Sequence, residues 1–162
     1  MSAARDMATA LAAPEDQPAA AFRGLEALAR AAVGAQLFTV MLRDPARGVA
    51  RRAYSNMPDA YPVSGEKPWG DDRWSATVAR GEAFVANDVA GFADVFADHA
   101  LIASLGFESV LNLPIILAGE LRGTLNCLAG PGHFTPERIA AAEALRVPGA
   151  AAILLADALA RG

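Results

Sequence analysis

Apolar residues recur in two stretches of the chain at the three- and four-residue spacing of an amphipathic helix. The first stretch begins near Ala19 and should end at Gly34, because glycine adopts the left-handed conformation of a helix cap without strain. The second follows Thr135, where a capping side chain, a proline and an acidic residue come in succession, and it runs to about Ala160. Pro148-Gly149 should kink or break this last helix.

Strand-forming residues fill five other segments. Residues 36–43 and 49–55 flank a turn that contains proline and glycine, so they predict an antiparallel hairpin. Residues 109–117 carry the strongest strand signal, and residues 121–129 return from them after a second tight turn. Residues 83–86 predict a further short strand.

The middle of the chain connects the two predicted hairpins. Residues 56–70 contain three prolines and two glycines, which predicts a loop, and this loop carries Tyr61 and Trp69. Asp71-Asp72 should cap a short helix, and residues 90–105 should form one or two more. Hairpins flanked by helices predict an α+β fold with a central antiparallel sheet. The N- and C-terminal helices would cover one face, and the middle helices and loops the other.

The first 18 residues differ from the rest of the chain. Pro14 and Pro18 interrupt them and few large apolar side chains are present, so we expect a flexible lead-in over residues 1–18 and a single domain over residues 19–162. The start has no positively charged segment followed by a compact apolar core, which argues against a signal peptide. No apolar run reaches the roughly 20 residues of a membrane span. We therefore expect a cytoplasmic protein.

Composition argues against two classes of partner. The net charge is −4, the pI is near 5.1, and the one adjacent basic pair, Arg51-Arg52, lies within a predicted strand. Nucleic-acid binding and attachment to an anionic membrane both need clustered basic residues, so neither is expected. Cys127 is the single cysteine, which excludes an internal disulfide and a CxxC motif.

Several short motifs, in this order, resemble the GAF domain family. They are residues 74–81 leading to Asn87-Asp88-Val89, the strand Ser109–Ile115 with its proline, Gly119 followed by Gly123-Thr124-Leu125-Asn126, and Phe134–Glu137 before the last helix. Each motif is degenerate alone, and the resemblance rests on their order and spacing from about Phe22 to Leu159. PAS domains have a similar sheet, but helices at both ends favour the GAF family.

The resemblance implies a ligand cavity between one face of the sheet and the mid-chain helices and loops. GAF domains bind cyclic nucleotides, haem, bilins, amino acids or other metabolites, so the resemblance names neither the ligand nor a cofactor. Most GAF domains are joined to an output domain, for which the 162 residues leave no room. We therefore expect the chain to act on a partner protein in trans.

Amide and aromatic side chains are the candidate ligand contacts. Asn112 and Asn126 lie among apolar residues in the two strongest strands, and a buried amide needs a partner, either a ligand or a nearby loop. The aromatic-rich loop would either wall a pocket or pack as a lid on a smaller core. The candidate ligand-binding residues are Tyr54, Asn56, Tyr61, Trp69, Trp74, Phe96, His99, Ser109, Asn112 and Asn126.

Two residues bear on catalysis. His99 follows Asp94 and Asp98, but consecutive helical residues point in different directions, which favours a polar pocket residue over a base or metal ligand. Cys127 lies in an apolar strand and is interpreted as core filler. One GAF family reduces free methionine sulfoxide with an attacking and a resolving cysteine, and here a second thiol is absent. No residue is therefore assigned to catalysis or to a metal.

Three functions remain open. The first is a ligand-binding sensor, the second a small enzyme similar to the free methionine sulfoxide reductases, and the third a ligand-free dimerisation scaffold. In each case the terminal helices should form a homodimer through an apolar surface. That surface is predicted to comprise Phe22, Leu25, Leu145, Ile153, Leu154 and Leu159.

Overall fold

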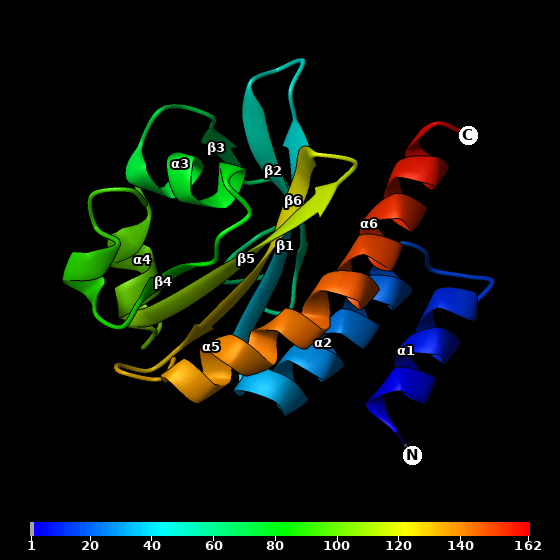
Figure 1. The fold of residues 1–162 in the computed structure, drawn as a ribbon, viewed down its shortest axis with the longest axis horizontal. Coiled ribbons are helices and arrows are strands. Elements are labelled where there is room, and N and C mark those ends of the chain that lie inside the picture. Colours follow the sequence, from blue (N-terminus) through cyan, green and yellow to red (C-terminus); the bar gives the residue numbers. More distant parts are fainter. Residues whose placement is uncertain (1) are drawn as a thin grey trace.

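A computed structural model describes residues 2–162 and contains one sheet between two layers of helices (Figure 1). Each pairing between neighbouring strands is antiparallel, and the order across the sheet is β3-β2-β1-β6-β5-β4. The strands are β1 (Leu37–Asp44), β2 (Val49–Ser55), β3 (Glu66–Pro68), β4 (Phe84–Ala86), β5 (Ser109–Leu117) and β6 (Glu120–Ala129). The predicted α+β class and both hairpins are confirmed, and β3 adds a short strand within the predicted loop.

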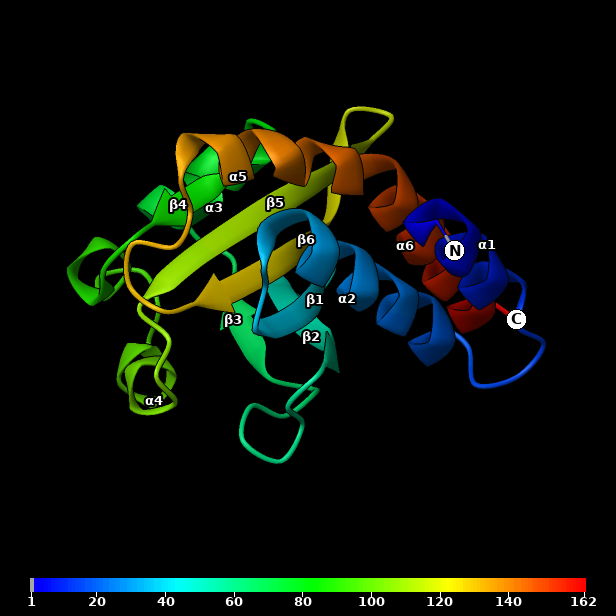
Figure 2. The same cartoon turned by 90° about the horizontal axis from the view of Figure 1, so that it is seen from below.

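The helices divide between the two faces of the sheet (Figures 1 and 2). The terminal helices α1, α2, α5 and α6 lie on one side, whereas α3, α4 and the long connecting loops lie on the other. Their bounds are α1 (Ala3–Ala12), α2 (Ala19–Val33), α3 (Arg73–Ala79), α4 (His99–Ser104), α5 (Pro136–Ala142) and α6 (Arg146–Ala160), with 3₁₀ turns η1 (Val89–Gly91) and η2 (Glu143–Leu145).

The ends of the helices agree with the sequence signals except at the C-terminal break. Gly34 caps α2 with a φ of 69°, and the Thr135 side chain caps α5 by accepting a hydrogen bond from the backbone N–H of Arg138. The chain leaves α-helical geometry at η2, ahead of Pro148. Pro148 itself lies in the first turn of α6, where a backbone N–H has no acceptor within the helix and its loss is tolerated.

The N-terminal segment differs from the loose lead-in that its prolines suggested. Ser2 caps helix α1, and Met7 on this helix is only 4% exposed because it packs into the main core. Alanine has the highest helix propensity, so an alanine-rich run forms a helix once a large side chain anchors it. Helices α1 and α2 approach closely at Gly24 of α2, where an added Cβ atom would lie 2.8 Å from the Cβ of Ala10 in α1.

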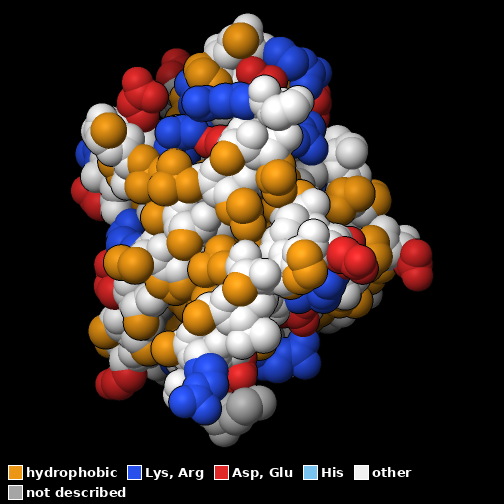
Figure 3. All heavy atoms as spheres, turned by 90° about the vertical axis from the view of Figure 1, so that its right-hand side faces the viewer, with side chains coloured by type: hydrophobic (Ala, Val, Ile, Leu, Met, Phe, Trp, Pro, Cys, Tyr) orange, Lys and Arg blue, Asp and Glu red, His pale blue; other side chains and the backbone are white. Residues whose placement is uncertain are grey.

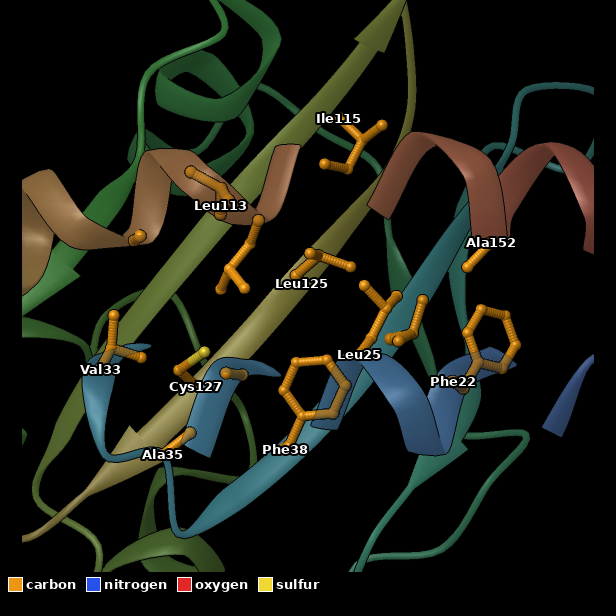
Figure 4. Close-up of a cluster of buried hydrophobic side chains, with 14 of the residues drawn as sticks. Phe22, Leu25, Val33, Ala35, Phe38, Leu113, Ile115, Leu125, Cys127 and Ala152 are labelled. Atoms are coloured by element: carbon orange, nitrogen blue, oxygen red, sulfur yellow. The ribbon is translucent and has the colours of Figure 1, made fainter. Parts of the chain in front are cut away.

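The main hydrophobic core lies between the sheet and α2, α5 and α6 (Figure 4). Alternate residues of β1, β5 and β6 point into it, as the two-residue period of a strand requires. Phe22 and Leu25 of α2 and Ile153 of α6 meet them from the helices, and each is at most 1% exposed. Because this face buries the large apolar side chains, the other positions of the same strands can carry polar groups.

Apolar side chains are exposed on the side of the molecule that α1 and α6 share (Figure 3), and those of α6 include Leu154 and Leu159. Leu154 and Leu159 are 49% and 50% exposed, but the other four residues of the predicted dimer surface are buried in the core, namely Phe22, Leu25, Leu145 and Ile153. By length and composition alone, the helical run Pro136–Ala160 could cross a membrane, which the sequence analysis did not anticipate. One third (33%) of the apolar 18-residue stretch within this run is buried, and the core helix of a soluble protein can have the same length and composition.

Candidate ligand pocket

The polar floor of the candidate pocket comes from three strands in register. Thr39 of β1 lies opposite Asn126 of β6, which lies opposite Asn112 of β5. All three side chains point away from the main core, because side chains alternate between the faces of a strand. They are 1%, 5% and 4% exposed respectively, so their polar groups need partners within the protein.

These side chains form one directed chain of hydrogen bonds that begins at Trp74 of α3. The indole Nε1–H donates to Asn112 Oδ1 (3.0 Å), Asn112 Nδ2 donates to Asn126 Oδ1 (2.8 Å), and Asn126 Nδ2 donates to Thr39 Oγ1 (3.0 Å). An indole N–H can only donate, so Asn112 must turn its oxygen toward Trp74 and its nitrogen toward Asn126. Asn126 must in turn face Asn112 with its oxygen, because the nitrogen of Asn112 can only donate. Trp74 therefore sets the orientation of both amides.

This direction leaves hydrogen-bond donors at the floor. Each amide nitrogen carries two protons and uses one of them in the chain. The Thr39 hydroxyl accepts from Asn126 Nδ2, and among residues 2–162 its own proton has no hydrogen-bond acceptor. The floor consequently suits a ligand atom that accepts hydrogen bonds.

A cavity of about 270 Å³ lies against this floor. Trp74 and Phe96 form part of its wall, and the ring of Phe96 packs against the rings of Trp74, Phe84 and Phe92 with centroids 6.4, 6.0 and 5.7 Å apart. Aromatic walls with a few placed polar groups are typical of small-molecule pockets. The volume is just below the usual range of roughly 300–1,000 Å³, so it suits a small ligand.

Arg52 of β2 brings a charge to the cavity. The residue is 8% exposed, its guanidinium carbon lies 3.7 Å from the centroid of the Tyr61 ring, and its Nη1 donates to the Pro62 carbonyl at 2.7 Å. The Tyr61 hydroxyl in turn donates to Asp98 Oδ2 at 2.6 Å. Burial raises the pKa of Tyr61 well above its ordinary value, so this hydroxyl keeps its proton at neutral pH.

Arg52 is paired less well than the other charged residues at the cavity. The nearest carboxylate oxygen, on Asp98, lies 3.8 Å from Arg52 Nη2, which is beyond hydrogen-bond distance. Arg52 Nε is buried and has no hydrogen-bond partner among residues 2–162. By contrast, two other lining charges have close partners, in the pairs Lys67–Asp72 at 3.2 Å and Arg47–Glu66 at 2.5 Å. The Arg52 guanidinium is therefore the lining charge with the most unused hydrogen-bonding capacity.

Half of the predicted ligand-binding residues line this cavity, namely Tyr61, Trp74, Phe96, Asn112 and Asn126. Trp69 lies one layer behind the wall. Its ring centroid is 5.6 Å from that of Trp74, and the guanidinium of Arg43 lies 4.2 Å from its centroid. The aromatic loop thus supports the wall through Trp69 and contributes to it directly through Tyr61.

Tyr54 and Asn56 lie on the other side of the sheet from the cavity. A β-bulge pairs Tyr54 with Val40 and Arg52 with Met41, so Ala53 is an additional residue in β2. Without the bulge, residues 52 and 54 would share a face; with it, Tyr54 packs near Phe22 of α2 at a centroid distance of 5.8 Å. Its hydroxyl donates to Glu26 at 2.7 Å, and Asn56 also donates to Glu26. Both residues tie β2 to helix α2.

Ser109 and His99 are engaged in local hydrogen bonds away from the cavity lining. The Ser109 hydroxyl donates to the carbonyl of Gly130 and accepts from the backbone N–H of His133. His99 Nδ1 lies 2.8 Å from the Phe96 carbonyl at the start of α4. Cys127 lies in the main core, where burial raises the pKa of its thiol to about 12.

The sequence reasoning missed several residues at the cavity, among them Thr39, Arg52 and Asp98. Thr39 carried a usable signal, because it is a polar residue in an apolar strand in the same way as Asn112. Arg52 carried none, because the bulge that separates it from Tyr54 depends on strand pairing. Within residues 2–162, no group of three or more His, Cys, Asp or Glu side chains is placed to hold a metal ion.

Comparison with known proteins relates this fold to one family. The sequence model of the GAF domain matches residues 16–153. Among solved structures, the chain is similar to the GAF domain of a phosphoenolpyruvate-protein phosphotransferase from Coxiella burnetii, with 22% identity, 99% of both chains covered and a TM-score of 0.67. None of the curated proteins compared matches the sequence.

Two further structures show how widely the fold is used. The GAF domain of a two-component sensor histidine kinase from Bacillus halodurans is 14% identical, with 86% of this chain and 95% of that chain covered and a TM-score of 0.66. The free methionine-R-sulfoxide reductase from Neisseria meningitidis, in complex with its substrate, is 18% identical, with 96% and 88% covered and a TM-score of 0.68. At these identities the similarity shows a common fold and nothing more specific.

The protein belongs to the GAF domain family, because the family match spans most of the chain. This confirms the resemblance carried by the motifs around Ser109–Ile115 and Gly123–Asn126.

Proposed function

We propose that this protein is a cytoplasmic sensory or regulatory GAF module that binds a small molecule and acts on a partner protein in trans. One observation carries the proposal: the cavity of about 270 Å³ has aromatic walls and a floor of hydrogen-bond donors whose orientation is fixed by Trp74. A site with fixed donors discriminates between ligands, because a ligand that leaves them unpaired binds less well. Discrimination of this kind is what a sensor needs.

The two tryptophans of the chain provide a direct reporter for this proposal. Trp74 lines the cavity and Trp69 packs against it, so a ligand should change the intrinsic fluorescence. We expect fractions of a metabolite extract to shift the emission of the protein, and native mass spectrometry to give the mass of what is bound. A Trp69→Phe variant, with Trp74 as its sole tryptophan, should respond in the same way. Emission unchanged by every fraction, with no bound mass, would contradict ligand binding.

A reductase that uses this cavity receives no support from the cysteine. Cys127 is 0% exposed, points into the main core, and has a pKa raised to about 12 by burial, so its thiol is protonated at neutral pH. Reduction of free methionine sulfoxide by the wild-type protein, and its loss in Cys127→Ala, would favour the enzyme over the sensor.

We infer further that α6 forms a homodimer through its outer face. Val147, Ala151, Leu154 and Ala158 follow one another at spacings of four, three and four residues, as in a coiled-coil seam. Val147 is 81% exposed, and a second copy of the same stripe would cover it. Light scattering at micromolar concentration should give twice the chain mass, and Leu154→Glu should give a monomer with an unchanged circular dichroism spectrum. A wild-type monomer would refute this assembly.

A further inference from the structure

The guanidinium of Arg52 is fixed in position by its surroundings. It stacks on the ring of Tyr61 at 3.7 Å and donates through Nη1 to the carbonyl of Pro62. Gly65 lies directly against it, since a Cβ at this position would be 2.5 Å from Nη1. A charged group that is already oriented loses little conformational entropy when a ligand binds to it.

The same guanidinium has no strong counter-ion. Its side chain is 10% exposed, so water compensates little of its charge, and Nε has no hydrogen-bond partner among residues 2–162. Asp98 stays 3.8 Å from Nη2, is 39% exposed, and accepts its short hydrogen bond from Tyr61 instead. Arg52 therefore gains more from a new partner than Asp98 does, because Asp98 is already hydrogen-bonded and partly hydrated.

We propose that the cavity binds a small monocarboxylate, with its carboxylate held by Arg52 in place of the long contact to Asp98 and its apolar body against Trp74 and Phe96. The inference rests on the proposed function, since it requires the cavity to be the ligand site. A planar carboxylate matches the fork of a guanidinium and accepts two parallel hydrogen bonds from it.

The remaining charges at the cavity favour one negative charge over two. Lys67 donates to Asp72 at 3.2 Å, which leaves Arg52, among residues 2–162, as the lining cation without a hydrogen bond to a carboxylate. Glu66 and Asp98 also line the cavity, and their carboxylates would repel the second charge of a phosphate. A single carboxylate on a compact apolar body therefore fits both the charge and the volume.

Three probes of similar size test the charge of the head group. Benzoate, benzamide and benzylammonium share an aromatic ring and carry a negative, a neutral and a positive head. We expect benzoate to quench or shift the tryptophan emission. It should bind about tenfold or more tighter than benzamide, because a hydrogen bond to a charged group stabilises a complex more than a hydrogen bond between neutral groups does. Benzylammonium should bind more weakly than both.

Variants of the two charged residues assign the effect. Arg52→Met should remove the preference for benzoate over benzamide, while Arg52→Lys should keep part of it. Arg51→Met is the matched control, because Arg51 is the exposed neighbour of Arg52 in the same strand and should leave the preference unchanged. Asp98→Asn should strengthen benzoate binding, because it removes a carboxylate that competes for Arg52.

The outcomes separate this inference from the proposed function. Benzylammonium or benzamide binding more tightly than benzoate would overturn the carboxylate assignment and leave a ligand-binding cavity in place. Benzoate binding that is unchanged in folded Arg52→Met, or weakened in Asp98→Asn, would also overturn it. Loss of binding for all three probes, together with no bound mass in native mass spectrometry, would overturn both proposals. If Arg52→Met does not fold, the Arg52→Lys and Asp98→Asn results decide.

Discussion

Removal of Asn112 from the hydrogen-bond chain should destabilise the protein by an amount that depends on which partners are left. Asn112→Leu keeps the branched shape of the side chain but leaves two buried groups unpaired, Trp74 Nε1 and Asn126 Oδ1. A buried group that loses its partner costs about 1–3 kcal/mol. Both groups border the cavity, so we take about 1.5 kcal/mol for each, in the lower half of that range. We expect a loss of about 3 kcal/mol in the free energy of unfolding.

A double-mutant cycle distinguishes this explanation from a simple loss of packing. Asn126→Leu also leaves two groups unpaired, Asn112 Nδ2 and the oxygen of Thr39. The double variant Asn112→Leu/Asn126→Leu leaves only two in total, Trp74 Nε1 and the Thr39 oxygen, because the two amides disappear together. Its loss should therefore be about 3 kcal/mol, half of the roughly 6 kcal/mol that addition of the single variants gives.

Urea denaturation followed by far-ultraviolet circular dichroism measures these losses, since tryptophan emission would itself respond to a change beside Trp74. Thr39→Val is the control, because it removes only the last acceptor of the hydrogen-bond chain and leaves one group unpaired, Asn126 Nδ2. It should lower the free energy of unfolding by about half as much as Asn112→Leu. Additive losses in the double variant, or an Asn112→Leu variant as stable as the wild type, would refute the directed chain.

Three other predictions follow from the core and the N-terminal helix. Gly149→Ala should lower the free energy of unfolding by about 1–3 kcal/mol in urea, because its Cβ would lie 2.8 Å from Leu125 Cδ1, whereas Gly130→Ala, with no atom within 4 Å, should be near neutral. Burial raises the pKa of the Cys127 thiol from 9.0 to about 12 in the folded protein. Between pH 9 and pH 12 the thiol ionises in the unfolded chain but not in the folded protein, so the free energy of unfolding should fall by up to about 1.4 kcal/mol per pH unit in that interval and be unaffected by this group below pH 9. Cys127→Ala should lack that alkaline loss, and the wild-type thiol should resist alkylation at about pH 8 until urea unfolds the chain. Met7→Ala should weaken the packing of α1 on the core by about 2–5 kcal/mol and make residues 3–12 accessible to limited proteolysis. An unchanged digestion pattern would mean that Met7 does not anchor the helix.

Local signals in the sequence determined the elements and the candidate floor of the pocket. The Thr135 cap, the Gly34 cap and the two tight turns depend on a few neighbouring residues, so they could be predicted without any knowledge of the fold. The two asparagines were recognisable for a similar reason, because an amide within an apolar strand must find a partner. The family motifs extended this reading to the sheet and its helical layers.

Tertiary structure decided which side chains share the cavity. Strand alternation would place residues 52 and 54 of β2 on one face, and only pairing with β1 introduces the bulge that sends Tyr54 to helix α2 and Arg52 to the cavity. The helix α1 likewise depends on a distant surface, since Met7 is buried only when α2 and the core are assembled. Short-range patterns fix how a segment folds, but which of its faces meets another segment is set by contacts between residues far apart in the chain.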